Sequence, residues 1–112
     1  MKPRITLITL GVDDLERAVR FYRDGLGWPT EGTVGTEFEH GAVAFFDLHH
    51  GLRLALWPRA SIAHGTGLPL GAASPTSMML AHNVASAAQV DSVMATAEAA
   101  GAHVLKPARA TD

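Results

Sequence analysis

Histidine is the residue type in this chain best suited to acid–base or metal chemistry, and six histidines occur among its 112 residues, with no cysteine. His49 and His50 are adjacent and lie between two apolar runs. Such a pair could bind a metal, but adjacent histidines in a tight turn are more often solvated. His40 follows Glu37 and Glu39 in a looser polar cluster. This cluster lacks a convergent fourth ligand and is interpreted as surface.

The elements that must position such residues occur twice along the chain. Residues 4–27 and 77–101 each contain a short apolar strand that ends in Val, a helix cap and an amphipathic helix that stops at Gly. Aligning Val12 with Val84 superimposes the two segments. The duplication predicts one pseudo-symmetric α+β domain with a cavity between its halves.

Periodicity and capping signals place the individual elements. The first helix is expected to begin at Asp13, because Glu16 completes a capping box, and the second at Ser86 with Gln89. Strands are expected at the apolar runs 5–12, 42–48, 52–57 and 76–84 and, less clearly, at 28–33 and 102–106. The single domain, residues 1–112, thus has a first module at 4–58, a loop-like linker at 59–75 and an incomplete second module at 76–112.

Charge and composition exclude several classes of partner. A net charge of −2 gives no basic footprint for nucleic acid. The apolar run at the N-terminus is brief and broken by threonines, and Asp13 follows it at once, so we expect neither a signal peptide nor a membrane span. The absence of cysteine fits a reducing compartment, and the expected location is cytoplasmic.

The run from Leu10 to Gly27, L-x-V-x-D-L-E-R-A-V-x-F-Y-x-D-x-L-G, resembles the opening of the vicinal oxygen chelate superfamily. That superfamily contains glyoxalase I, extradiol dioxygenases, fosfomycin-resistance enzymes and bleomycin-resistance proteins. The resemblance implies tandem βαβββ modules, each curled into a half-open mixed sheet. It also implies a ligand site between the modules, often with a divalent metal.

The positions where the resemblance places the metal ligands hold no suitable donors. In the pattern H-x-x-L-x-V-x-D-L the His falls on Leu7, and its counterpart in the second module is Met79. The Glu of L-x-L-E-L falls on Ala55, and the fourth ligand would lie on a final strand that this sequence lacks. Leu and Ala cannot donate, and a thioether is a poor ligand for hard or borderline ions. We therefore expect no metal and no cofactor, and the family's metalloenzyme activities are not carried over.

Strand alternation, combined with the resemblance, selects the side chains that should face the cavity. The predicted ligand-binding residues are Leu7, Thr9, Phe46, Ala55, Trp57, Met79 and Asn83. Trp57 could stack on a planar ligand or pack against a partner subunit, and Asn83 could bond a ligand or cap a turn. Phe46 is favoured over its neighbour Phe45. His82 falls on the helix side of its strand, which favours a structural role over that of a catalytic base.

Three functions compete at this level. The favoured one is metal-free binding of an apolar or planar small molecule, as in the bleomycin-resistance branch. The alternatives are a glyoxalase-type lyase or dioxygenase-like enzyme acting on a small metabolite, and a non-catalytic interaction domain, so whether the chain is an enzyme stays open. A second module short of two strands leaves sheet edges unpaired, which predicts a homodimer.

Overall fold

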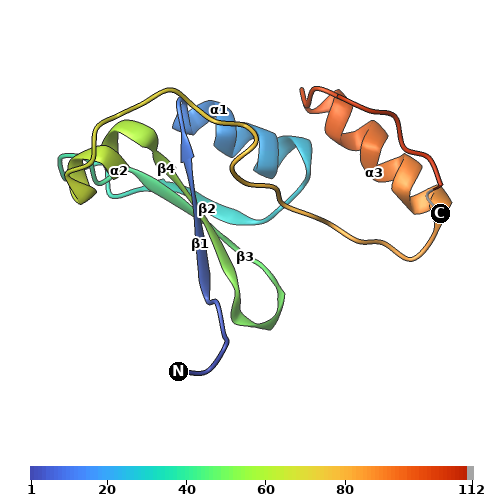
Figure 1. Ribbon diagram of the computed structural model, residues 1–112, viewed down its shortest axis with the longest axis horizontal. Coiled ribbons are helices and arrows are strands. Elements are labelled where there is room, and N and C mark those ends of the chain that lie inside the picture. The colour runs from blue at the N-terminus through green and yellow to red at the C-terminus, as the bar shows by residue number, and fades with distance from the viewer. Residues whose placement is uncertain (111–112) are drawn as a thin grey trace. The chain divides into compact units, whose positions relative to one another are not determined.

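The computed structural model describes residues 1–110 and divides the chain into two compact units, the first ending at Gly71 and the second beginning at Ala72. The elements of the first unit are β1 (Leu7–Val12), α1 (Leu15–Arg20), β2 (Thr30–Val34), β3 (Val43–Asp47), β4 (Arg53–Pro58) and α2 (Arg59–Thr66) (Figure 1). In the described part of the second unit the regular element is α3 (Ala87–Ala99). The predicted α+β fold class is confirmed.

The four strands form one mixed sheet in the order β1-β4-β3-β2. The predicted hairpin is confirmed, since β3 and β4 pair antiparallel across the short turn His49–Gly51. β1 pairs parallel with β4, so that Leu7 lies opposite Arg53 and Thr9 lies opposite Ala55. β1 and β2 are the two edges, and β2 agrees with the weak edge strand expected near residues 28–33.

The cap of α1 lies one residue later than predicted. Asp14 has the extended backbone of an N-cap, and its Oδ1 accepts the N–H of Arg17 at 3.1 Å. The expected cap at Asp13 is wrong, because two consecutive aspartates give the same sequence signal and only one can occupy the position. Glu16, expected to complete the box, instead accepts the hydroxyl of Thr33 at 2.5 Å, which ties α1 to β2.

The core lies between α1 and one face of the sheet. Its buried residues are Leu15, Val19, Ala44, Phe46, Leu54 and Leu56. The ring of Phe46 is fully buried, and the rings of Tyr22 and Trp28 lie 5.7 and 6.5 Å from it, centroid to centroid. Burial raises the pKa of Tyr22, because the charged phenolate would be desolvated there.

Phe46 therefore does not face a ligand cavity, and that prediction is wrong. Register explains the error: Phe45 lies opposite Ala55, whereas Phe46 lies opposite Leu54 beneath α1. Two adjacent aromatic residues on a strand must point to opposite faces, but the pair alone does not say which residue is inside.

Residues 59–75 are not a loop throughout, because their first half forms α2. The helix starts directly after Pro58 and ends at Gly67, whose φ of 73° suits a left-handed cap. The N–H of Gly67 donates to the carbonyl of Ala63 at 2.9 Å. The Gly and Pro content favoured a linker, although Pro58 and Gly67 mark the two ends of the helix and Gly65 lies within its last turn.

In the second unit the capped helix is confirmed, but the strands expected at 76–84 and 102–106 are not formed among the described residues. The hydroxyl of Ser86 accepts the N–H of Gln89 at 3.2 Å, and the Gln89 side chain accepts the N–H of Ala85 at 3.0 Å. A strand needs a neighbour for its backbone groups, and β1 finds one only in the last strand of its own module. Residues 72–110 contain no strand that could play this part for 76–84. Within the described chain, none of the helices combines the length and apolar character that crossing a membrane requires.

Candidate functional site

The face of the sheet opposite α1, here called the open face, brings together four of the residues predicted from the sequence. Alternation along β1 and β4 places Leu7, Thr9, Ala55 and Trp57 on this face, and the register adds Phe45 from β3. Leu7 and Thr9 are exposed, whereas Ala55 is only 2% exposed. Around Ala55 the open face is thus apolar apart from the Thr9 hydroxyl, and its charged residues, Asp47 and Arg53, lie at the end of β3 and the start of β4.

The donor set of the open face does not fit the metal that the fold implies. Leu7 and Ala55 stand at two of the expected ligand positions, and both side chains end in methyl groups. Divalent ions of the hard or borderline kind need imidazole nitrogen or carboxylate oxygen. Among residues 1–110, no three His, Asp or Glu side chains come together to hold an ion. We derive no chemical step through a metal at this face.

Trp57 is held from two sides. Its indole N–H donates to the carbonyl of His40 at 3.1 Å, which connects β4 to the loop between β2 and β3. Its ring packs on α2 at Gly65, where an added Cβ would lie 3.2 Å from the ring. Trp57 therefore has a structural role in the first unit in addition to its place on the face that carries Ala55.

A cluster of polar side chains behind Trp57 was missed in the sequence. The ring of His40 stacks on that of His64, with centroids 4.2 Å apart and planes 18° apart. Nδ1 of His40 lies 3.2 Å from the hydroxyl of the buried Ser61. The interpretation of His40 as part of a surface cluster is therefore wrong. No sequence signal points to this contact, because it depends on α2, and the composition of that segment predicted a linker instead of a helix.

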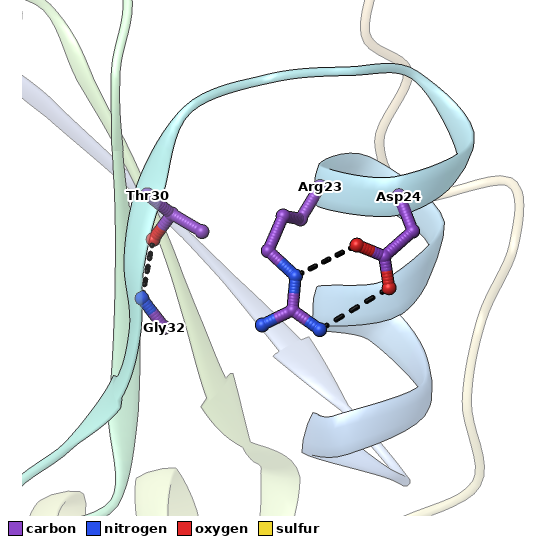
Figure 2. A network of polar contacts seen from close by, with 4 residues as sticks. All are labelled: Arg23, Asp24, Thr30 and Gly32. Atoms are coloured by element: carbon purple, nitrogen blue, oxygen red, sulfur yellow. Dashed lines mark hydrogen bonds and ion pairs between the residues drawn. The ribbon is translucent and has the colours of Figure 1, made fainter.

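A hollow of about 310 Å³ opens beside the open face at the β2–β3 edge. It is lined by Pro29, Thr30, Glu31, Gly32, Val34, Phe45, Asp47 and Arg53. The hydroxyl of Thr30 donates to the carbonyl of Phe45 at 2.6 Å. It also accepts the N–H of Gly32 at 3.1 Å, as Figure 2 shows. Gly32 lies in an irregularity of β2 with a φ of 83°, a conformation that favours glycine. The Thr30 hydroxyl thus fixes the wall of the hollow.

The helical segment Phe21–Gly25, which continues α1 as a π-helix, carries its own ion pair. Nε and Nη2 of Arg23 donate to the two carboxylate oxygens of Asp24 at 2.9 and 3.2 Å (Figure 2). The bond from Arg23 holds the pKa of Asp24 below its ordinary value. Because the two side chains bind each other and are both exposed, we assign the pair no part in ligand binding.

Two charged residues of the hollow, Asp47 and Arg53, lie on the open face itself, and Arg53 lies directly opposite Leu7 on the neighbouring strand. Its Nε donates to Oδ1 of Asp47 at 2.9 Å, and its Cζ lies 4.3 Å from the centroid of the Phe45 ring. Alternation on β4 gave Arg53 the same face as Ala55 in the sequence, but nothing there marked it as a binding group.

Met79 and Asn83 belong to the second unit and lie outside any helix or strand. Both are exposed, Met79 to 88%. His82, which directly precedes Asn83, is exposed and outside any strand as well, so the alternation argument for it no longer applies. The roles predicted for Met79 and Asn83 in ligand binding stay predictions.

Comparison with solved structures supports the fold over nearly the whole chain. A glyoxalase-related enzyme from Fulvimarina pelagi is 34% identical, with a TM-score of 0.80 over 98% of this chain and 73% of that one. A glyoxalase/bleomycin resistance protein/dioxygenase from Nocardioides is 29% identical, with a TM-score of 0.69 over 96% and 68% of the two chains. Lactoylglutathione lyase from Agrobacterium tumefaciens, at 20% identity and a TM-score of 0.57 over 95% and 76%, shares the fold alone.

No curated protein matches the chain in sequence. The profile of one family does match, over residues 4–111. The match begins before β1 and includes both α1 and α3, so it covers both copies of the duplicated segment. The chain belongs to the Glyoxalase/Bleomycin resistance protein/Dioxygenase superfamily.

Proposed function

We propose that this protein binds an apolar or planar small molecule on the open face of its sheet, without a metal ion. One observation carries the proposal: Leu7 and Ala55 replace donors by methyl groups on a face shared with Phe45 and Trp57. Small-molecule sites are mostly apolar and aromatic, with a few polar groups that fix orientation. Thr9 supplies one such group.

A second candidate is a glyoxalase-type enzyme acting on a small metabolite. The 34% identical protein from Fulvimarina pelagi is described as a glyoxalase-related enzyme, which favours this candidate. The same fold carries different chemistries, however, and the open face supplies no donor for the Lewis-acid step.

The proposal predicts both metal content and ligand response. Protein purified without a histidine tag should contain less than stoichiometric Zn, Ni, Mn and Fe by elemental analysis. In a thermal-shift screen, metal salts should leave the melting temperature unchanged, and planar metabolites should raise it, because a ligand of the folded state adds stability by mass action.

A matched pair of variants places the response on the open face. Thr9→Arg should abolish the shift by filling the face, whereas Thr36→Arg, the same change at an exposed loop residue, should preserve it. One equivalent of bound metal whose removal by a chelator abolishes a measured activity would contradict the proposal and favour the enzyme.

We also propose that the protein forms a homodimer. β1 and β2 are edge strands, and within residues 1–110 no strand pairs with their outer sides. Exposed edges pair readily with another chain. Light scattering at micromolar concentration should give about twice the monomer mass of 11.8 kDa. A mass equal to that of the monomer would refute self-association.

A further inference from the structure

We infer that Arg53 makes the hollow at the β2–β3 edge a carboxylate subsite, so that the ligand of the open face is a small planar carboxylate. This inference rests on the proposed function and adds the chemical class of the ligand. It concerns the guanidinium of Arg53, which lies directly opposite Leu7 on β1 and diagonally from Phe45 on β3.

The guanidinium group of Arg53 has donors to spare. It carries five N–H groups in a planar fork. Within residues 1–110 its one hydrogen bond runs from Nε to Asp47. The two terminal nitrogens are therefore open to an acceptor, and a carboxylate matches their spacing with two parallel bonds.

Stacking on Phe45 fixes the plane of that fork. The Cζ of Arg53 lies 4.3 Å from the ring centroid, within the range of a cation–π contact. The contact leaves the Arg53 side chain 47% exposed, half withdrawn from water but accessible from the hollow. A guanidinium held in one orientation loses less entropy when it binds an acceptor than a freely moving one.

Two carboxylates of the hollow oppose an anion, but both are well solvated. The Asp47 side chain is 81% exposed, and Glu31 is exposed as well. Exposed charges are strongly screened, so these two carboxylates oppose an anion only weakly, whereas the fork of Arg53 can still bind one through two parallel hydrogen bonds. The balance favours the anion, and it predicts that removing the Asp47 charge should strengthen binding.

The size and the walls of the hollow define the rest of the ligand. Its volume of about 310 Å³ is at the low end of the range for small-molecule pockets. Pro29, Val34 and Phe45 supply apolar walls. A single aromatic ring with a carboxylate fits both the volume and the lining.

Three probes of nearly equal shape test the inference: benzoate, benzamide and benzylamine. Each is titrated into ¹⁵N-labelled protein, with dissociation constants read from the NMR shifts and the Arg53 Nε–H signal as a local reporter. Wild type should bind benzoate more tightly than benzamide, and benzylamine most weakly. The Arg53→Gln variant should bind benzoate about three- to tenfold more weakly than wild type and should bind benzamide with unchanged affinity.

Further variants separate the charge from the fold. Arg53→Lys should retain part of the preference for benzoate, since it keeps the charge and loses the fork. Asp47→Asn should tighten benzoate binding, and Arg17→Gln on α1, on the opposite face, should change nothing. The melting temperature of each variant verifies that it is folded.

The outcomes distinguish this inference from the proposed function. If benzamide binds as tightly as benzoate, or if Arg53→Gln weakens both equally, the carboxylate subsite is wrong while small-molecule binding stands. If benzylamine binds best and Asp47→Asn weakens it, the hollow is a cation site and the inference is overturned. If no probe binds at millimolar concentration and the thermal-shift screen also finds no ligand, both fail.

Discussion

Replacement of Phe46 by alanine is expected to lower the free energy of unfolding by about 3–5 kcal/mol. The Phe46 side chain is fully buried beneath α1 and packs against Tyr22 and Trp28. Its removal loses the transfer free energy of a large ring and leaves a cavity that neighbouring strands cannot fill. Urea denaturation monitored by circular dichroism measures the change.

The control for this substitution is Phe38→Ala. Phe38 is 68% exposed in the loop between β2 and β3, and its loss should change stability by no more than about 0.5 kcal/mol. A Phe46→Ala variant as stable as wild type, with weakened ligand binding, would return Phe46 to the ligand face and contradict the core described above.

Replacement of Trp57 by alanine is expected to lower the affinity for the planar compound selected by the thermal-shift screen about tenfold to a thousandfold. The reason is the loss of a large aromatic surface from the face that carries Ala55. The variant should also be less stable, because the bond to the His40 carbonyl and the packing on Gly65 disappear. Isothermal titration measures the affinity at a temperature where the variant is folded.

Trp57→Phe is the matched control, since it keeps one aromatic ring and loses the indole N–H together with the second ring. It should retain most of the affinity. Trp28→Ala is unsuitable, because Trp28 packs on Tyr22 and Phe46 in the core. If Trp57→Ala is destabilised but binds as tightly as wild type, the indole serves packing alone and the binding proposal loses its main aromatic residue.

Local signals in the sequence were sufficient for the hairpin, α1 and α3. The apolar runs around the turn His49–Gly51 and the Ser86 cap involve residues that are close in sequence, so the elements that they specify can be predicted from the sequence alone. The strand expected at 76–84 has equally good local signals and does not form in the described chain. Its backbone hydrogen bonds would have to come from a strand that is distant in sequence, and local sequence signals do not show whether such a partner is present.

The candidate site divides in the same way. Alternation in the sequence alone predicts that Leu7 and Thr9 share one face of β1 and that Ala55 and Trp57 share one face of β4. Alternation shows which residues of one strand share a face, but it does not show which face is buried. The pairing of β3 with β4 decides that Phe46, and not Phe45, lies in the core. The stacking of His40 on His64 depends on α2, which lies between Pro58 and a segment rich in glycine and proline, and the sequence did not reveal that helix.

The pairing of β1 with β4 also sets an order of assembly. It joins residue 7 to residue 53, so nearly the whole module must be closed as a loop before β1 gains a neighbour. The β3–β4 hairpin closes over a turn of three residues and should form much earlier, because loop-closure entropy delays distant contacts. During synthesis the first strand made is therefore the last to be paired. Until then its apolar sequence, LITLGV, stays available to other chains, and the face that carries Leu7 and Thr9 does not yet exist.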